Sequence, residues 1–140
     1  MSELSKEAED YLKNHGLCVF ATGRKDGSPQ QSLLGYQFDG KEFLLGGQVT
    51  SFKMKNLRRN PKASLTVVDG RGHVVVYGTC ELVEDEAEMA KLQERFGPRA
   101  APPGQEPKPG DPPPPPRPAM GPRMNILFKP DKYLYNRMTG

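Results

Sequence analysis

Turn signals at short intervals restrict the fold of this chain more than any other feature of its sequence. Lys25-Asp26-Gly27, Asp39-Gly40 and Gly70-Arg71-Gly72 each follow a short segment of β-forming or alternating apolar residues. Asp-Gly between two such segments is a strong signal for a two-residue hairpin. Short strands joined by tight turns pair antiparallel, so the chain is expected to fold mainly from β-strands that close into a barrel.

Three helical patterns interrupt the predicted strands. Their apolar residues recur at helical spacing, and each pattern ends at Asn, Gly or Pro. The predicted helices lie before Asn14, at 51–59 and at 84–96, and the predicted strands are 17–23, 30–38, 42–48, 62–69, 73–83 and 124–137. Pro130 is expected to break the last of these strands once. The sequence therefore predicts a mainly β fold with six strands and three short flanking helices.

Proline is concentrated in one part of the chain. Of 15 prolines, 11 lie between Pro102 and Pro122. Such a segment is expected to be polyproline II or disordered, and a variable surface loop is favoured over a ligand for a proline-recognising domain. The remaining residues, about 115, suffice for one modest barrel. Residues 1–140 are therefore predicted to form a single domain with a Pro-rich insertion at 100–123.

Composition also limits the cellular locations and binding partners that are expected for the protein. The first ten residues carry acids rather than a secretory signal, and no apolar run approaches the roughly 18 residues that cross a bilayer. Cys18 and Cys80 lie in apolar segments and are expected to be buried thiols in a reducing compartment. A net charge of +3 does not demand nucleic acid or an anionic membrane. The expected location is the cytoplasm, without nucleic-acid or membrane partners.

The segment Val74 to Tyr77 is apolar without alternation. A strand of this kind is typical of a sheet covered on both faces. In a small barrel, the second cover is expected to come from a helix or from another subunit.

Residues 43–68 contain five cations and no acid. The start of the predicted helix at 51–59 has capping hydroxyls at Thr50 and Ser51, and Lys53 adds a positive charge to its first turn. Helix starts normally favour acids, because their free N–H groups and the helix dipole are electropositive. Two interpretations follow: an anion, such as a terminal phosphate, binds here, or the helix is a solvated basic helix with an ordinary cap.

Glycines flank this segment. Gly46-Gly47 ends the strand that leads into the helix, and Gly35 interrupts the preceding strand. Glycine weakens a strand unless something must approach the backbone closely. A flat ring system lying across the two strands would explain these glycines, and so would bulges in a tightly curved barrel.

These motifs resemble those of the FMN-binding split-barrel superfamily. The resemblance rests on Ala21-Thr22, on 26–30, on 38–40 and on 51–65, where Lys53-x-x-Asn-Leu-Arg-Arg-Asn-Pro61 is moderately specific. It covers about residues 4–97 and the last strand. The superfamily includes pyridoxamine 5′-phosphate oxidase and the deazaflavin (coenzyme F420)-dependent reductases, and the chain looks closer to the reductases.

The resemblance implies a six-stranded antiparallel split β-barrel that forms a homodimer with the cofactor at the interface. The implied cofactor-binding residues form three groups: the phosphate ligands Lys53, Ser51 and Thr50, the ring-lining residues Ser32, Leu33 and Leu34, and the residues beside the ribityl chain, Gly47, Gln48 and Val49. The oxidases carry an arginine where this chain has Phe52 and end in an arginine motif that it lacks. F420 is therefore the expected cofactor, with FMN as the alternative.

The leading functional hypothesis is hydride transfer between a reduced deazaflavin and a small unsaturated substrate, with the reactive centre on the cofactor. The alternatives are an FMN-binding oxidase-like protein and a carrier that binds flavin, deazaflavin or tetrapyrrole without turnover. The sequence indicates no catalytic residue and no metal ligand: His15 and His73 lie at turns without a ligand partner at useful spacing. Tyr36, Tyr77 and Tyr135 could contact substrate or donate a proton, although core or interface roles are favoured for each.

Overall fold

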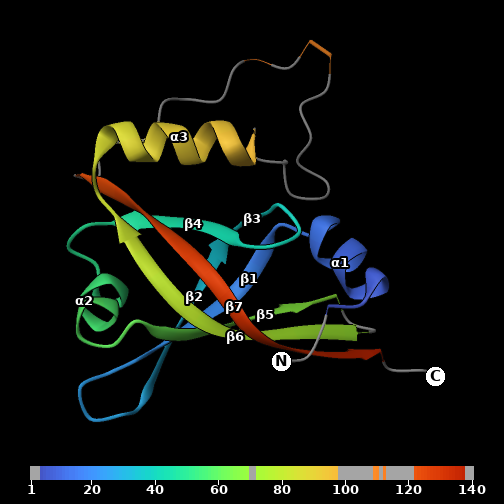
Figure 1. The fold of residues 1–140 in the computed structure, drawn as a ribbon, viewed down its shortest axis with the longest axis horizontal. Coiled ribbons are helices and arrows are strands. Elements are labelled where there is room, and N and C mark those ends of the chain that lie inside the picture. Colours follow the sequence, from blue (N-terminus) through green and yellow to red (C-terminus); the bar gives the residue numbers. More distant parts are fainter. Residues whose placement is uncertain (1–3, 70–71, 98–108, 111, 113–121, 138–140) are drawn as a thin grey trace.

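A single antiparallel sheet, curled on itself and flanked by three helices, forms the described part of the computed structural model (Figure 1). The structure describes residues 4–69, 72–97, 109–110, 112 and 122–137, so the predicted insertion at 100–123 lies almost wholly outside them. The sheet order is β2-β1-β5-β6-β7-β4-β3. The elements are α1 Lys6–Lys13, β1 Leu17–Gly23, β2 Pro29–Gly35, β3 Gln37–Phe38, β4 Phe43–Gln48, α2 Phe52–Arg59, β5 Lys62–Val68, β6 Gly72–Val83, α3 Glu86–Phe96 and β7 Arg123–Arg137.

The sheet has seven strands rather than the predicted six, because the strand expected at 30–38 is broken at Tyr36. Before the break, β2 pairs with β1; after it, β3 pairs with β4. The Tyr36 backbone N–H donates to the Gly16 carbonyl, and its hydroxyl donates to the Leu12 carbonyl at 2.6 Å. Since β2 and β3 stand at opposite ends of the sheet order, the continuous chain through Tyr36 requires the sheet to curl until its ends meet.

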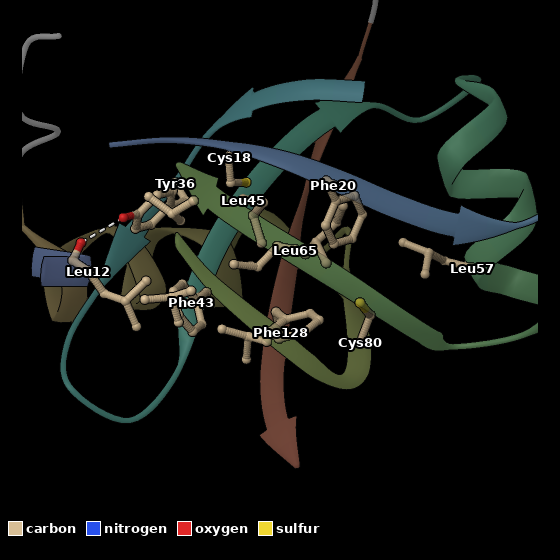
Figure 2. Close-up of a cluster of buried hydrophobic side chains, with 14 of the residues drawn as sticks. Leu12, Cys18, Phe20, Tyr36, Phe43, Leu45, Leu57, Leu65, Cys80 and Phe128 are labelled. Atoms are coloured by element: carbon tan, nitrogen blue, oxygen red, sulfur yellow. Dashed lines mark hydrogen bonds between the residues drawn. The ribbon is translucent and has the colours of Figure 1, made fainter. Parts of the chain in front are cut away.

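The core fills the inside of the curled sheet (Figure 2). Phe20, Phe43 and Phe128 are among its largest buried side chains, and Phe128 packs edge-on against the other two rings. Leu12 of α1 and Leu57 of α2 add to the core from the two ends. Cys18 and Cys80 are buried free thiols, as expected from the sequence.

Strand β7 continues through Pro130, where the sequence suggested a break. A bulge accommodates the proline: Tyr77 pairs with Lys132 and Gly78 with Pro130, which leaves Asp131 as an extra residue. Proline is tolerated in a sheet at such bulges. A Cβ at Gly78 would overlap the Lys129 carbonyl oxygen and approach Phe128 Cζ to 2.9 Å. The close pairing of β6 and β7 at the bulge therefore requires glycine at position 78.

Among the described residues of a single chain, the outer face of β6 is left partly open, so a second cover from another subunit stays a prediction. Val74 and Val76 are buried in the core, but Tyr77 on the other face is 44% exposed and Val75 only partly buried. The register across five strands places four apolar side chains and one threonine next to one another on this outer face. This outer apolar row consists of Leu33, Val19, Thr66, Val75 and Leu134.

The flanking helices differ in how firmly they pack. Ser5 caps α1, and Ala8 and Leu12 are buried, which confirms its predicted apolar face. In contrast, α3 buries no residue completely. Within the described residues, no helix is both long and apolar enough to span a bilayer.

Candidate functional site

The amino terminus of α2 is a basic helix start with a serine cap. Ser51 Oγ accepts the Met54 N–H at 3.4 Å, and the first turn contains no acid. A buried amide fixes the helix in place: Asn56 Nδ2 donates to Thr22 Oγ1 on β1 at 3.1 Å and to Gln30 Oε1 on β2 at 2.7 Å. These two bonds tie the middle of α2 to β1 and to β2, and β2 is one of the two strands on which a ring was expected.

Lys53 lies against the end of β4. A Cβ at Gly47 would approach Lys53 Cε to 2.6 Å and Nζ to 2.8 Å, so glycine at 47 is what allows the ammonium to lie on the strand. Partial burial, and secondarily the positive charge of Arg123, hold the pKa of Lys53 below its usual value. Among the described residues, no ion pair to a carboxylate offsets these costs. Lys53 is thus a half-buried cation in surroundings that favour an added anion.

The other cations of this segment mostly have partners. Arg58 pairs with Glu84 at 3.2 Å, and Arg59 donates to the Gly23 carbonyl at 2.7 Å. Lys55 Nζ lies 5.3 Å from the centre of the exposed Phe52 ring. These contacts fit the solvated-helix interpretation for the outer face of α2, whereas Lys53 does not share it.

A cavity of about 400 Å³ lies where the two ends of the curled sheet meet; we call it the seam pocket. Its walls are formed by 33–37, by 44–46, by 123–125 and by Gln93 of α3. β2 and β3 are the end strands of the sheet, so within the part of the chain that the structure describes each has an edge without a neighbouring strand. Such edges present backbone N–H and C=O groups in register. None of the described residues that line the pocket is acidic, and Gln37, Gln93, Arg123 and Asn125 supply amide and guanidinium groups.

Arg123 and Asn125 are site residues that sequence reasoning missed. The first residue of β7 is Arg123, which pairs in register with Gln48 at the end of β4. Its guanidinium Nη2 would lie 3.9 Å from a Cβ at Gly46. No local pattern pointed to it, because it follows the Pro-rich segment and only the β4–β7 register brings it beside the basic helix.

The structure brings the predicted residues together in part. Leu33 and Leu34 line the seam pocket, with Leu33 70% exposed, and Ser32 lies on the same strand facing inward. Lys53, Ser51 and Thr50 are not part of its lining. These three residues lie just beyond the pocket in the sequence. Gly46 lines the pocket, and the Lys53 side chain lies against the next residue, Gly47. Gln48 pairs with Arg123, and the Val49 N–H donates to the Pro122 carbonyl at 3.0 Å.

Of the tyrosines and histidines singled out from the sequence, Tyr36, Tyr135 and His15 have structural side-chain contacts, whereas Tyr77 is 44% exposed. Burial raises the pKa of Tyr36, whose hydroxyl is held by Leu12, and the Tyr135 hydroxyl lies 3.1 Å from Glu7 Oε1. The His15 ring stacks on Tyr11, with 4.2 Å between ring centres. No group of three or more potential metal ligands occurs among the described residues.

Comparison with known proteins links this arrangement to solved structures. An F420 reductase is 25% identical, with a TM-score of 0.62 over 90% of this chain and 94% of that protein. A conserved hypothetical protein from Mycobacterium tuberculosis is 22% identical, with a TM-score of 0.68 over 98% of this chain and 85% of the other. General Stress Protein 26 from Bacillus anthracis is 17% identical, with a TM-score of 0.63 over 93% and 92% of the two chains.

The curled sheet and its seam are therefore a known architecture, and the last two of these proteins support the fold alone. The sequence itself goes further than the fold. The family model described as pyridoxamine 5′-phosphate oxidase matches residues 4–133, which is nearly the whole chain and includes β2, β4, α2 and most of β7. By that match, the chain belongs to the pyridoxamine 5′-phosphate oxidase family.

Proposed function

We propose that this protein is an oxidoreductase that uses coenzyme F420, with the cofactor phosphate at Lys53 and its ring system in the seam pocket. The observation that carries the proposal is a half-buried lysine that lies against Gly47 and has no carboxylate partner among the described residues. The neighbouring glycine, Gly46, lines a pocket whose described lining contains no acid. The match to an F420 reductase favours a deazaflavin over FMN.

The residues present fit a cofactor of this shape. A planar ring with amide-like edges can bond to the backbone of Leu33 and Leu34 at the free edge of β2. The cavity volume, about 400 Å³, lies in the range of pockets that hold small molecules. Ser51, Thr50 and the free N–H groups of the α2 start lie beside Lys53 and suit the phosphate. Gly46 and Gly47 have no side chains, which leaves space for the part of the cofactor that joins the ring to the phosphate.

When bound, the cofactor supplies the reactive carbon for hydride transfer to a small unsaturated substrate. The chain's own part is to bind, orient and shield. Lys53 and the α2 start fix one end of the cofactor, and the edge of β2 fixes the plane of the ring. Leu44 and Leu45 exclude water from one side of the pocket, while the exposed side chain of Leu33 marks the open side for the substrate.

A homodimer belongs to this proposal. The outer apolar row begins at Leu33, which also lines the seam pocket. A second copy packed on this row would cover the outer face of β6 and close the open side of the site.

The first test is binding. Lys53→Ala should weaken F420 binding by about 10- to 100-fold while the fold is kept, because a charge-assisted hydrogen bond is worth about 1.5–3 kcal/mol. Fluorescence titration measures the affinity, and the same series with FMN decides between the cofactors. Lys55→Ala, on the same helix but over Phe52, is the matched control and should bind normally. Equal affinities for the wild-type protein and Lys53→Ala would refute the phosphate assignment.

Two alternatives to an F420-dependent enzyme remain distinct: an FMN-binding oxidase-like protein and a non-catalytic carrier. The visible absorption spectrum of the purified protein identifies a retained flavin. Steady-state oxidation of the reduced cofactor by small unsaturated acceptors separates an enzyme from a carrier. A carrier would bind the cofactor through the same contacts but would not catalyse its oxidation.

A further inference from the structure

We propose that the last turn of α3 is a gate of the seam pocket, and that Arg95 latches it to the hairpin of β3 and β4. The latch is built from contacts between described residues, whereas its part in ligand exchange rests on the proposed function. Opening of this gate would let a ligand enter and leave while the curled sheet keeps its structure.

The C-terminal half of α3 contributes to the walls of two cavities. Gln93 lines the seam pocket, and Phe96, three residues later, lines a second cavity of about 130 Å³ beside α1 and β3. Tyr36 and Gln37 line both cavities, so the two are neighbours. Residues three apart lie on the same side of a helix. A movement of this helix turn away from the sheet would therefore open both cavities at once.

Polar contacts to one hairpin hold this last turn. The Arg95 guanidinium lies 2.7 Å from Asp39 Oδ2 and 2.9 Å from Glu42 Oε1. Gln37 Nε2 donates to the Gly97 carbonyl at 2.5 Å. The three partners all lie between 37 and 42, in β3 and the turn that follows it. Contacts that join one end of a helix to a single hairpin can break and form together, as the parts of a latch do.

The hairpin side of the latch is preorganised. Asp39 Oδ1 accepts the N–H groups of Lys41 and Glu42, each at 2.9 Å, while Oδ2 accepts from Arg95 Nε at 3.0 Å. Partial burial acts to raise the pKa of Asp39, but the hydrogen bonds from Glu42, Lys41 and Arg95 hold this pKa below its usual value. Because the turn fixes the carboxylate by itself, the latch can close again without rebuilding its hairpin side.

The rest of α3 opposes opening only weakly. None of its residues is fully buried, and its larger apolar side chains are half-buried. Only two residues separate Val83, at the end of β6, from Glu86, at the start of the helix. Exposed ion pairs add little net stability, and elements with few buried contacts open locally at a low cost in free energy. The short connection to β6 therefore serves as the hinge and Arg95 as the latch.

A thiol placed in the seam pocket measures the opening of the gate. Leu44 lines this pocket together with Gln93 and is 4% exposed, so a cysteine there is shielded while the gate is closed. The native thiols, Cys18 and Cys80, provide the internal reference, because burial raises the pKa of each to about 12 and keeps them unreactive. The measurement is the rate at which an aromatic disulfide reagent labels Leu44→Cys.

The labelling rate is compared among variants made in the Leu44→Cys background. Arg95→Ala removes the latch, and Asp39→Asn keeps an oxygen for the turn N–H groups while it removes the charge. Lys91→Ala is the matched control, because it removes an exposed ion pair on the same helix. The melting temperature checks the fold of each variant.

Arg95→Ala should speed labelling at position 44 by about threefold to fivefold, the range that exposed ion pairs support. Asp39→Asn should have a similar effect that does not add to it, and Lys91→Ala should have none. About 1 M salt should speed labelling unless Arg95 is already replaced. Unchanged labelling in Arg95→Ala would overturn the inference. Labelling of Cys18 that accelerates by the same factor would also overturn it, because the whole protein would then be opening.

Ligand exchange tests the role of the gate. Stopped-flow fluorescence gives the association and dissociation rate constants of F420 and of FMN. In Arg95→Ala both rate constants should rise by the same factor, about threefold to fivefold, and the dissociation constant should stay the same. A residue that binds the ligand would change the dissociation constant instead.

The two proposals fail in different ways. If labelling accelerates in Arg95→Ala while the rate constants of a bound cofactor do not change, α3 is not the route of exchange, and the inference is wrong while the proposed function stands. If neither cofactor binds the wild-type protein, the proposed function fails and takes the exchange role with it, whereas the labelling rates alone decide whether the latch exists.

Discussion

At the scale of single residues, the unusual feature is a lysine that is partly buried beside an arginine. The sequence pointed to Lys53 because 43–68 contains no acid, and the local charge pattern was enough to identify it. Arg123 could not be found in this way. It is 70 residues further along the chain, and its position depends on the β4–β7 register, which no local pattern specifies.

The pKa of Lys53 predicts how phosphate binding responds to pH. In the free protein, burial and Arg123 lower the pKa, so the ammonium is lost at a lower pH than for an ordinary lysine. A bound phosphate favours the ammonium and raises the pKa in the complex. Between the two pKa values, binding takes up a proton, and the affinity falls by up to about tenfold for each pH unit.

Titration of the protein with FMN from about pH 8 to about pH 10 measures this fall, since the phosphate is fully ionised throughout that range. Lys53→Arg should flatten the profile, because guanidinium keeps its proton. Riboflavin serves as the control for ionisation of the ring. A profile of Lys53→Arg as steep as that of the wild type would contradict the assignment of the slope to Lys53.

At the scale of elements, α3 lies beside the curled sheet (Figure 1) and has no fully buried residue. Its main anchor is Arg95, which lies 2.7 Å from Asp39 Oδ2 and 2.9 Å from Glu42 Oε1 in the β3–β4 hairpin. Gln93, two residues earlier, lines the seam pocket. Among the described residues, α3 is the only helix that contributes to the pocket wall, and the two ion pairs of Arg95 hold it in place.

Arg95→Ala is expected to loosen α3 without unfolding the protein. Exposed ion pairs contribute about 1 kcal/mol or less, and α3 has no fully buried residue. Hydrogen exchange of the α3 amides should accelerate by up to about fivefold, while the melting temperature changes little. Lys91→Ala removes an exposed pair with Glu88 on the same helix and is the control. A large drop in melting temperature would show that α3 is integral to the fold.

Most elements were predictable from the sequence, because caps, turns and periodicity are local. Asp39-Gly40, for example, marked the β3–β4 hairpin directly. The two misses depend on neighbours instead. The break at Tyr36 arises because β2 and β3 pair with different strands, and β7 passes Pro130 because the partner strand offers a bulge and Gly78. The strands that cause these two changes lie elsewhere in the sequence, so the local pattern around Tyr36 or Pro130 cannot indicate them.

At the scale of the whole molecule, the outer apolar row predicts a dimer. Leu134→Glu places a charge in the row at a side chain that is 43% exposed, so the core should tolerate it. Because a two-fold interface repeats each substitution, the dimer dissociation constant should rise by about 100-fold or more. Analytical ultracentrifugation measures the change.

The exposed Lys91→Glu on α3 is the control for added negative charge and should leave the dimer intact. A wild-type protein that is monomeric at micromolar concentration, or a Leu134→Glu variant that remains as dimeric as the wild type, would show that the row is not the interface.

The residue that separates the two ends of the sheet, Tyr36, has a consequence for how the protein stays folded. The sheet is joined to itself there by covalent chain and a few bonds, and beyond them the edges face each other across the pocket. A molecule bound in that gap can form hydrogen bonds to strand edges that have no neighbouring strand there. A ligand that binds only the native state adds to the stability of that state. Occupancy of the pocket would thus raise the protein's resistance to unfolding, so that a cofactor bound there would also act as a part of the fold.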